Sequence, residues 1–321
     1  MAETNNNQID KSEILFLYES SFSVPNGDPF TGEQRYDEET KKALVSDVRI
    51  KRFIRDYLHE KGRDVYVIDP KDSTNKEQTG AGTRFKQLQS LERFKHLKNP
   101  LEILLQCIDA RLFGGIVTIK DDKKKPKKDE ATEGDEKSEK AFNVTGPVQF
   151  ALLNPSLNKI DLRMHQNTSV FPSGKGKERG AISTSTVVPY SLNQIHGWIN
   201  PYSAKHTQLT QDDISEMFEA LWNSINNANT RTKSNQNSLL LLQIVYAEPM
   251  KKLYGLDRLI NLVSEKQDEQ IRNGDDYTLD LSKLKDAVQK DTVAKVNFYT
   301  ERDDLANELK SSPKFEQMQA L

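Results

Sequence analysis

The chain has a single cysteine and almost no net charge. One cysteine, Cys107, in 321 residues excludes an internal disulfide framework and a zinc site built from cysteines alone. Cys107 lies in an apolar stretch, so we expect a core side chain in a protein of a reducing compartment. The formal net charge is -2, so a nucleic-acid site must be a local basic stripe rather than a charged coat.

Long hydrophobic runs are also missing. No apolar run approaches the ~20 residues that a membrane-spanning helix needs. Residues 1–7 are polar and lack the apolar centre of a signal peptide. We therefore expect a soluble, cytoplasmic protein with no membrane contact.

Motifs for catalysis, metal binding and phosphate binding are missing as well. The sequence has no G-x-x-x-x-G-K-[ST] or G-x-G-x-x-G loop and no G-x-S-x-G nucleophile elbow. None of the five histidines has the spacing of a zincin-like site. We expect no catalytic residue, no metal and no cofactor.

A dense turn followed by a basic helix is what the sequence does contain. Residues 23–29, S-V-P-N-G-D-P, form the turn. Ser46 is a good N-cap, and Asp47 suits the positive end of the helix dipole. At about 100° per residue, an apolar arc faces a core and a second arc faces away. The apolar arc holds Ile50, Phe53, Ile54, Tyr57 and Leu58, and the second arc holds Val48, Lys51, Arg52, Arg55 and His59.

This pairing of a loop and a helix suits a phosphate backbone. Backbone donors in the turn and three cations on one helix face give affinity without reading sequence. An ordinary solvated surface helix would carry the same charges, so the pattern alone leaves both interpretations open.

The elements along the chain predict an α+β protein in one elaborated domain. Strands are expected at 13–19, 65–69, 116–119, 142–150, 184–190, 239–246, 277–281 and 293–299. Helices are expected from Ser46, over 85–108 with a break at Asn99–Pro100, and over 210–227, 256–264 and 282–290; residues 111–115 should turn. The order resembles a β-α-β-β-α-β ferredoxin-like core with an antiparallel sheet and excursions.

Two excursions have unusual compositions. Residues 163–186 interleave cations with glycines and Ser/Thr, which predicts a long protruding hairpin. Fifteen of the twenty residues over 121–140 are charged, seven lysines and eight acids, so this segment should be a flexible charged loop. It is either a lysine-rich tether to nucleic acid or a tolerated insertion between two strands.

Five motifs occur in order between residue 13 and about residue 200. They are N-G-D-P at 26–29, V-S-D-V-R-I-K-R-F-I-R-D-Y-L at 45–58, I-D-A-R-L-F-G-G at 108–115, T-G-P-V-Q-F at 145–150 and V-P-Y-S-L-N-Q-I-H-G-W at 188–198. This ordered set resembles the Cas seven family, the backbone subunits of type I CRISPR Cascade complexes, with the I-B branch the most similar.

The resemblance implies an RRM-like palm with an antiparallel sheet, a helical fingers insertion near 61–110 and a thumb hairpin near 163–188. It also implies a CRISPR RNA-binding role in antiviral defence. Several copies would polymerise along the spacer of the CRISPR RNA (crRNA) and present its bases for pairing with target DNA. The implied partners are crRNA, target DNA, neighbouring copies and other Cascade subunits.

The resemblance also implies a set of RNA-binding residues. The V-S-x-x-x-x-K-R-x-x-R pattern falls on the start of the basic helix, where Ser46 would donate to a phosphate. The thumb would supply an apolar wedge, with Met164 and Phe171 among its candidates. The full set is Asn26, Gly27, Ser46, Arg49, Lys51, Arg52, Arg55, Arg111, Arg163, Met164 and Phe171.

Two further interpretations remain open. Related subunits of type III complexes cleave target RNA through an aspartate in an early loop, and Asp28 lies in a comparable region. The chain would then be an endoribonuclease that cleaves target RNA through Asp28. Against this, a carboxylate at this position is expected to cap its own turn, and N-G-D-P resembles the type I form, whose members are not nucleases. The third interpretation is an interaction module whose basic helix binds an acidic protein.

Overall fold

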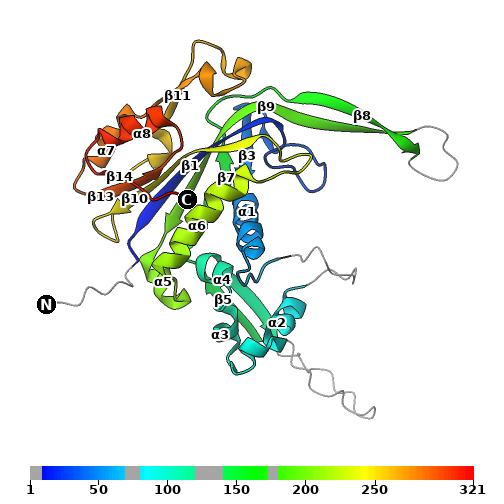
Figure 1. The fold of residues 1–321 in the computed structure, drawn as a ribbon, viewed down its shortest axis with the longest axis vertical. Coiled ribbons are helices and arrows are strands. Elements are labelled where there is room, and N and C mark those ends of the chain that lie inside the picture. The colour runs from blue at the N-terminus through cyan, green and yellow to red at the C-terminus, as the bar shows by residue number, and fades with distance from the viewer. Residues whose placement is uncertain (1–8, 69–79, 120–139, 173–179) are drawn as a thin grey trace. The chain divides into compact units, whose positions relative to one another are not determined.

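The computed structural model describes residues 9–68, 80–119, 140–172 and 180–321 (Figure 1). The chain divides into two compact units. The larger unit contains Asp10–Ile54, Gln149–Asn200 and Met217–Leu321, and the smaller one contains Arg55–Val148 and Pro201–Glu216 with Met1–Ile9. Most of the charged segment, 120–139, lies outside the described residues.

A seven-stranded sheet organises the larger unit. Its order is β14-β13-β10-β1-β9-β6, and β8 pairs with β9. Both neighbours of β1 are antiparallel to it, as expected. The strands are β1 (Ser12–Ser23), β6 (Val148–Phe150), β8 (Arg163–Pro172), β9 (Gly180–Ile199), β10 (Gln236–Tyr246), β13 (Val293–Tyr299) and β14 (Phe315–Gln317).

Two helices complete the expected ferredoxin-like order. These are α1 (Asp47–Glu60) and α6 (Gln211–Asn226), and each contributes residues to both units. Six elements form the core and follow the order β1, α1, β6, β9, α6, β10 along the chain, with other elements inserted between them. In the sheet, four of these strands run β10-β1-β9-β6. This is the β-α-β-β-α-β arrangement predicted from the sequence.

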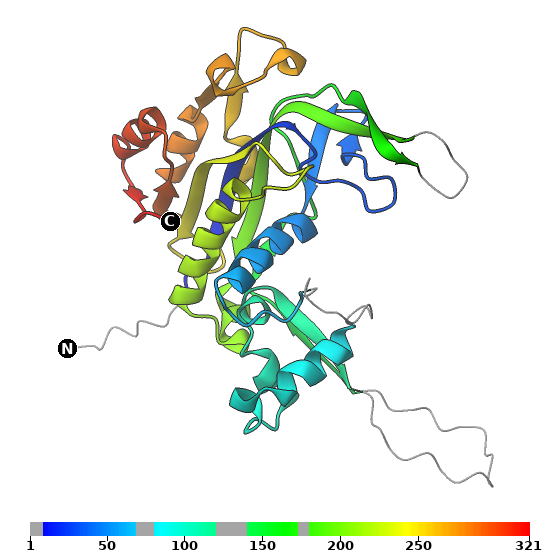
Figure 2. The ribbon, with the colours of Figure 1, turned by 45° about the vertical axis from the view of Figure 1, so that its right-hand side comes forward.

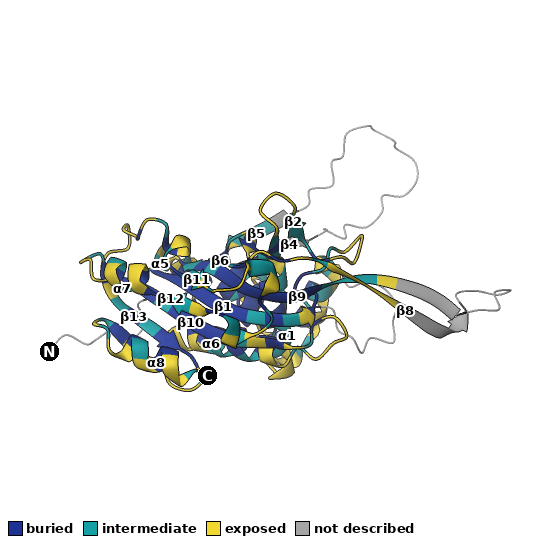
Figure 3. Ribbon diagram, turned by 90° about the horizontal axis from the view of Figure 1, so that it is seen from above, coloured by how far each residue is buried: buried dark blue, intermediate teal, exposed yellow. Residues whose placement is uncertain are grey.

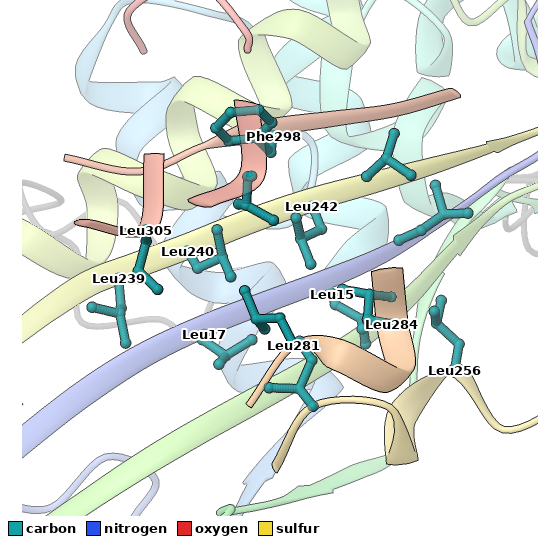
Figure 4. Packing of buried hydrophobic residues seen from close by; sticks show 14 of the residues in the cluster. Leu15, Leu17, Leu239, Leu240, Leu242, Leu256, Leu281, Leu284, Phe298 and Leu305 are labelled. Carbon is teal, nitrogen blue, oxygen red and sulfur yellow. The ribbon is translucent and has the colours of Figure 1, made fainter. Parts of the chain in front are cut away.

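Residues 14–18 of β1 are buried on both faces, which explains the unbroken apolar run I-L-F-L-Y at these positions. Leu15 and Leu17 pack with residues of β10, β13 and the C-terminal helices (Figure 4). On the opposite face, Phe16 contacts Trp222 of α6 at 6.2 Å between ring centroids. The helix α6 and the first turns of α1 cover this second face (Figure 2). Buried residues run along most of β1 and β10 (Figure 3).

Shorter elements surround the sheet. Thr210 caps α6 through its hydroxyl, which accepts from the Asp213 amide at 3.1 Å. The other elements of this unit are β2 (Tyr36–Asp37), β3 (Lys42–Ser46), β7 (Leu153–Pro155), η2 (Leu256–Arg258), β11 (Asn261–Val263), η3 (Asp268–Gln270), η4 (Gly274–Asp276), β12 (Thr278–Asp280), α7 (Ser282–Val288) and α8 (Asp303–Lys310).

The smaller unit is built from short helices and one strand pair. Its apolar cluster includes Phe85, Leu104 and Cys107, so the cysteine is a core residue as predicted, and burial raises the pKa of its thiol. The elements are α2 (Ala81–Ser90), η1 (Glu92–Phe94), α3 (Pro100–Leu104), α4 (Ile108–Phe113), β4 (Gly114–Ile119), β5 (Lys140–Thr145) and α5 (Pro201–Thr207).

The β8–β9 hairpin extends beyond the sheet. Gly180–Val187 pairs with β8, whereas Val188–Ile199 pairs with β1. One continuous strand therefore belongs to the hairpin in its first part and to the sheet in its second (Figures 1 and 3). The hairpin predicted over 163–186 is confirmed.

Three local predictions are wrong. Residues 65–68 form no strand, because the amides of Tyr66 and Val67 donate to the buried carboxylate of Asp109 at 2.7 and 3.0 Å. The helix expected over 256–264 is only the turn η2, and β11 then pairs with β12. Arg111 belongs to α4 rather than to a turn; the turn is made by Gly114, whose φ is +79°.

The region expected to be one broken helix over 85–108 consists of α2, η1 and α3. The break at Asn99–Pro100 is the start of α3, where the Asn99 side chain accepts from the Leu101 amide and Pro100 takes the first helical position. Among the described residues, no helix combines the length and the apolar character that crossing a membrane requires.

Candidate nucleic-acid interface

Asn26 joins the loop at residues 23–29, called the early loop below, to the start of α1. Its side-chain oxygen accepts from both the amide and the hydroxyl of Ser46, each at 2.7 Å. Its own amide donates to the Gln34 side chain at 2.9 Å, and its side-chain nitrogen donates to the Gly27 carbonyl. Asn26 is 5% exposed. Its polar atoms thus fix the loop against the helix.

Ser46 begins α1 as predicted. Its hydroxyl oxygen accepts from the Arg49 amide at 3.4 Å, and Asp47 lies in the first turn. The hydroxyl proton is directed at Asn26, so the contact expected between this hydroxyl and a phosphate is not available in this arrangement. A phosphate here would instead meet the end of the helix dipole and the neighbouring cations.

The cations of the first turns of α1 are held in place. The Lys51 ammonium lies 3.3 Å from Asp47 and 3.0 Å from the Gln149 side chain of β6. The Arg49 guanidinium lies 5.1 Å from the centroid of the Phe53 ring. Lys51 and Arg52 are half-buried. Side chains that are already ordered lose less conformational entropy on binding a ligand.

Lys233 is a further cation at this loop, and the sequence interpretation missed it. Its ammonium donates to the Val24 carbonyl and lies 3.5 Å from the Thr232 hydroxyl, both neutral groups. Lys233 is 9% exposed. Burial, reinforced by Arg49, lowers its pKa to about 8. Nothing in the polar run around it indicates burial, which arises because the Val24 amide bonds to the Thr232 carbonyl at 2.8 Å.

The predicted cations of the smaller unit pair with carboxylates. Arg55 lies 3.0 Å from the fully buried Asp109 and is 12% exposed. Arg111 binds Asp213 through two nitrogens at 2.6 and 2.9 Å. Although burial alone would raise the pKa of Asp213, the Arg111 guanidinium holds it below its usual range. This geometry favours structural roles for both arginines.

The hairpin residues are only partly described. Arg163 lies opposite Val187 at the base of the hairpin and is exposed. Met164 is also exposed, as a wedge would require. Phe171 belongs to β8, but its side chain lies outside the described part of the structure.

Asp28 caps its own turn. Its carboxylate accepts from the amides of Phe30 and Thr31 at 2.9 and 3.3 Å and lies 3.2 Å from Arg35. The bond from the Phe30 amide is the main reason that the pKa of Asp28 is lowered. No group of three or more His, Cys, Asp or Glu side chains suited to a metal occurs within the described residues.

The comparisons with known proteins agree with one another. The family described as CRISPR-associated protein Cas7 matches residues 10–282. A CRISPR-associated protein Cas7 of Haloferax volcanii is 28% identical over 295 residues, covering 88% of this chain and 84% of the relative.

Two solved structures are similar in fold. A chain of a CRISPR RNA-guided surveillance complex aligns with a TM-score of 0.50 at 13% identity, covering 97% of this chain and 95% of that one. A chain of a pre-nicking CRISPR RNA-guided surveillance complex aligns with a TM-score of 0.52 at 11% identity, covering 97% and 96%. Because the family match extends over most of the sequence, the chain belongs to the family of CRISPR-associated protein Cas7.

Proposed function

We propose that the chain is the crRNA-binding backbone subunit of a type I-B CRISPR surveillance complex. Copies of it polymerise along the spacer and hold the phosphate backbone, so that the bases remain available to pair with target DNA. Other Cascade subunits complete the particle. The family supports a role in such a complex, and the motifs of the chain support the I-B branch.

The observation that carries the proposal is the junction of the early loop with α1. Asn26 fixes the loop to Ser46, and ordered cations follow within two turns of the helix. Such an array suits successive phosphates of a single strand and reads no base. We therefore propose Gly27, Arg49, Lys51 and Arg52 as backbone contacts, with Arg163 at the base of the hairpin. Met164 of the hairpin is proposed as an apolar wedge against the RNA.

The proposal is tested by purifying the chain from cells that do or do not carry a matching CRISPR array, together with the other complex subunits. Sequencing the RNA that co-purifies should return uniform crRNA, in a particle much larger than the 36.7 kDa chain. A clean monomer in the presence of the other subunits would contradict the proposal.

The same preparation tests cleavage of target RNA through Asp28. The carboxylate of Asp28 is engaged by its own turn, and we expect RNA to remain intact with divalent metal present. Metal-dependent cleavage that Asp28→Ala abolishes would make the chain an endoribonuclease instead.

A further inference from the structure

Phe22 has an unfavourable backbone conformation. It lies next to the end of β1 with φ of +47°, in the left-handed region that residues with a side chain rarely adopt. A bulky aromatic residue is a clear outlier there. Such strain persists only where the surrounding structure imposes it.

The neighbours of Phe22 impose this conformation. On one side, the Ser21 amide bonds to the Asn235 carbonyl at 3.0 Å, and on the other the Val24 amide bonds to the Thr232 carbonyl at 2.8 Å. Ser21 and Ser23 also keep their register with β9. The backbone is therefore fixed on both sides of Phe22.

The stability of the fold does not explain why residue 22 is a phenylalanine. The side chain is 60% exposed, so much of its apolar surface remains in contact with water. Glycine would adopt the same backbone angle without strain. A strained and exposed aromatic ring contradicts two local rules at once, and functional sites are where such conflicts are expected.

Cations lie near the segment that contains Phe22. The Lys233 ammonium donates to the Val24 carbonyl, two residues along the chain, and Arg49 is the charged neighbour of that ammonium. Val188, where β9 passes from the hairpin into the sheet, is paired with Ser23. Lys233 is buried, so of these two cations the partly exposed Arg49 is the one that a phosphate could reach. An exposed ring with a cation in the same part of the fold is a combination that holds a single strand, because bases stack on rings and phosphates meet charges.

We infer that Phe22 is a stacking platform for one base of a single-stranded RNA, at the root of the hairpin. This inference rests on the proposed function, because it adds a base contact to the early loop and α1, whose other proposed contacts are with the RNA backbone. Stacking tolerates any base because each has an aromatic face, so the contact adds affinity without sequence preference.

Two substitutions distinguish the effect of the aromatic ring from the effect of the backbone strain. Phe22→Gly and Phe22→Ala both remove the ring, but only glycine relieves the strain, so we expect a higher melting temperature for the glycine variant. Both variants should bind a mixed-sequence single-stranded RNA of about 30 nucleotides with equal affinity, roughly tenfold below wild type. Phe22→Trp should restore binding, and RNA should quench its added fluorescence.

Two controls complete the design. Tyr254→Ala removes another exposed aromatic ring and should leave RNA affinity unchanged. Inorganic polyphosphate supplies charge without bases, and the Phe22 variants should bind it as wild type does. RNA binding that follows the melting temperatures of the two variants, or that equals wild type in both, would overturn the inference. A wild-type chain that binds no RNA would instead contradict the proposed function.

Discussion

At the scale of single residues, Asn26 connects the early loop to α1 and does not offer its side-chain oxygen to RNA. One amide oxygen accepts two hydrogen bonds from Ser46 while the rest of the side chain is buried. Asn26→Ala leaves the partly buried amide and hydroxyl of Ser46 without their acceptor, which costs about 1–3 kcal/mol. We expect that loss in urea unfolding. Asn307→Ala, at an exposed position of α8, is the control and should stay near wild type.

Lys233 predicts a dependence of stability on pH. Its pKa is about 8 in the folded chain against 10.5 for an ordinary lysine, so between these values the unfolded chain binds the extra proton. The free energy of unfolding should therefore rise with pH across this window, by up to about 1.4 kcal/mol per unit, and the contribution is lost as pH falls through 8.

Lys233→Met should remove that rise, because methionine carries no proton to release. The measurement is urea unfolding at intervals between pH 8 and 10.5. Lys283→Met, at an exposed position of α7, provides the matched control and should keep the wild-type slope. A Lys233→Met curve parallel to wild type would show that Lys233 titrates normally.

At the scale of elements, the sequence predicts those whose pattern is set locally. The strand expected over 293–299 coincides with β13, and α1 begins where Ser46 and the apolar arc place it. The wrong predictions concern segments whose hydrogen-bond partners are distant in sequence. Residues 65–68 look like a strand, yet their amides bind Asp109, more than forty residues away. Local patterning carries no information about such a partner.

The same limit applies to the candidate site. Charge periodicity identified Lys51 and Arg52, but it gave Arg55 the same role, because the sequence cannot show that Asp109 lies beside it. Lys233 and Phe22 were missed for a related reason. Their burial and strain arise from the pairing of residues 21–24 with 232–235, which are far apart in sequence.

The helix α1 allows a direct test of phosphate contact. Lys51→Ala combined with Arg52→Ala should weaken binding to single-stranded RNA and reduce the slope of log affinity against log salt by about 1.4, or about 0.7 for each cation removed. Binding is measured at several salt concentrations. Lys283→Ala with Lys290→Ala removes the same charge from exposed positions and should keep the wild-type slope. An unchanged slope in the α1 variant would remove these residues from the interface.

At the scale of the whole molecule, the central sheet does not depend on the hairpin for its strand pairing. Val188–Ile199 pairs with β1 in the centre of the sheet, and only Gly180–Val187 pairs with β8. Replacing residues 164–186 by a short glycine-containing turn between Arg163 and Val187 should therefore preserve the sheet and its buried cluster. Thermal unfolding of the variant should remain cooperative, with a melting temperature close to wild type.

Assembly should respond differently. If the hairpin arranges RNA between neighbouring copies, the variant will still bind a short single strand through Lys51, Arg52 and the early loop. It will not form regular arrays on a long crRNA. Sedimentation of the RNA-bound particles, with nuclease footprinting of the RNA, measures both properties. Regular protection and full-sized particles without the hairpin would show that assembly depends on other surfaces. Loss of short-RNA binding as well would mean that the hairpin itself supplies the primary contact, contrary to the role proposed for α1.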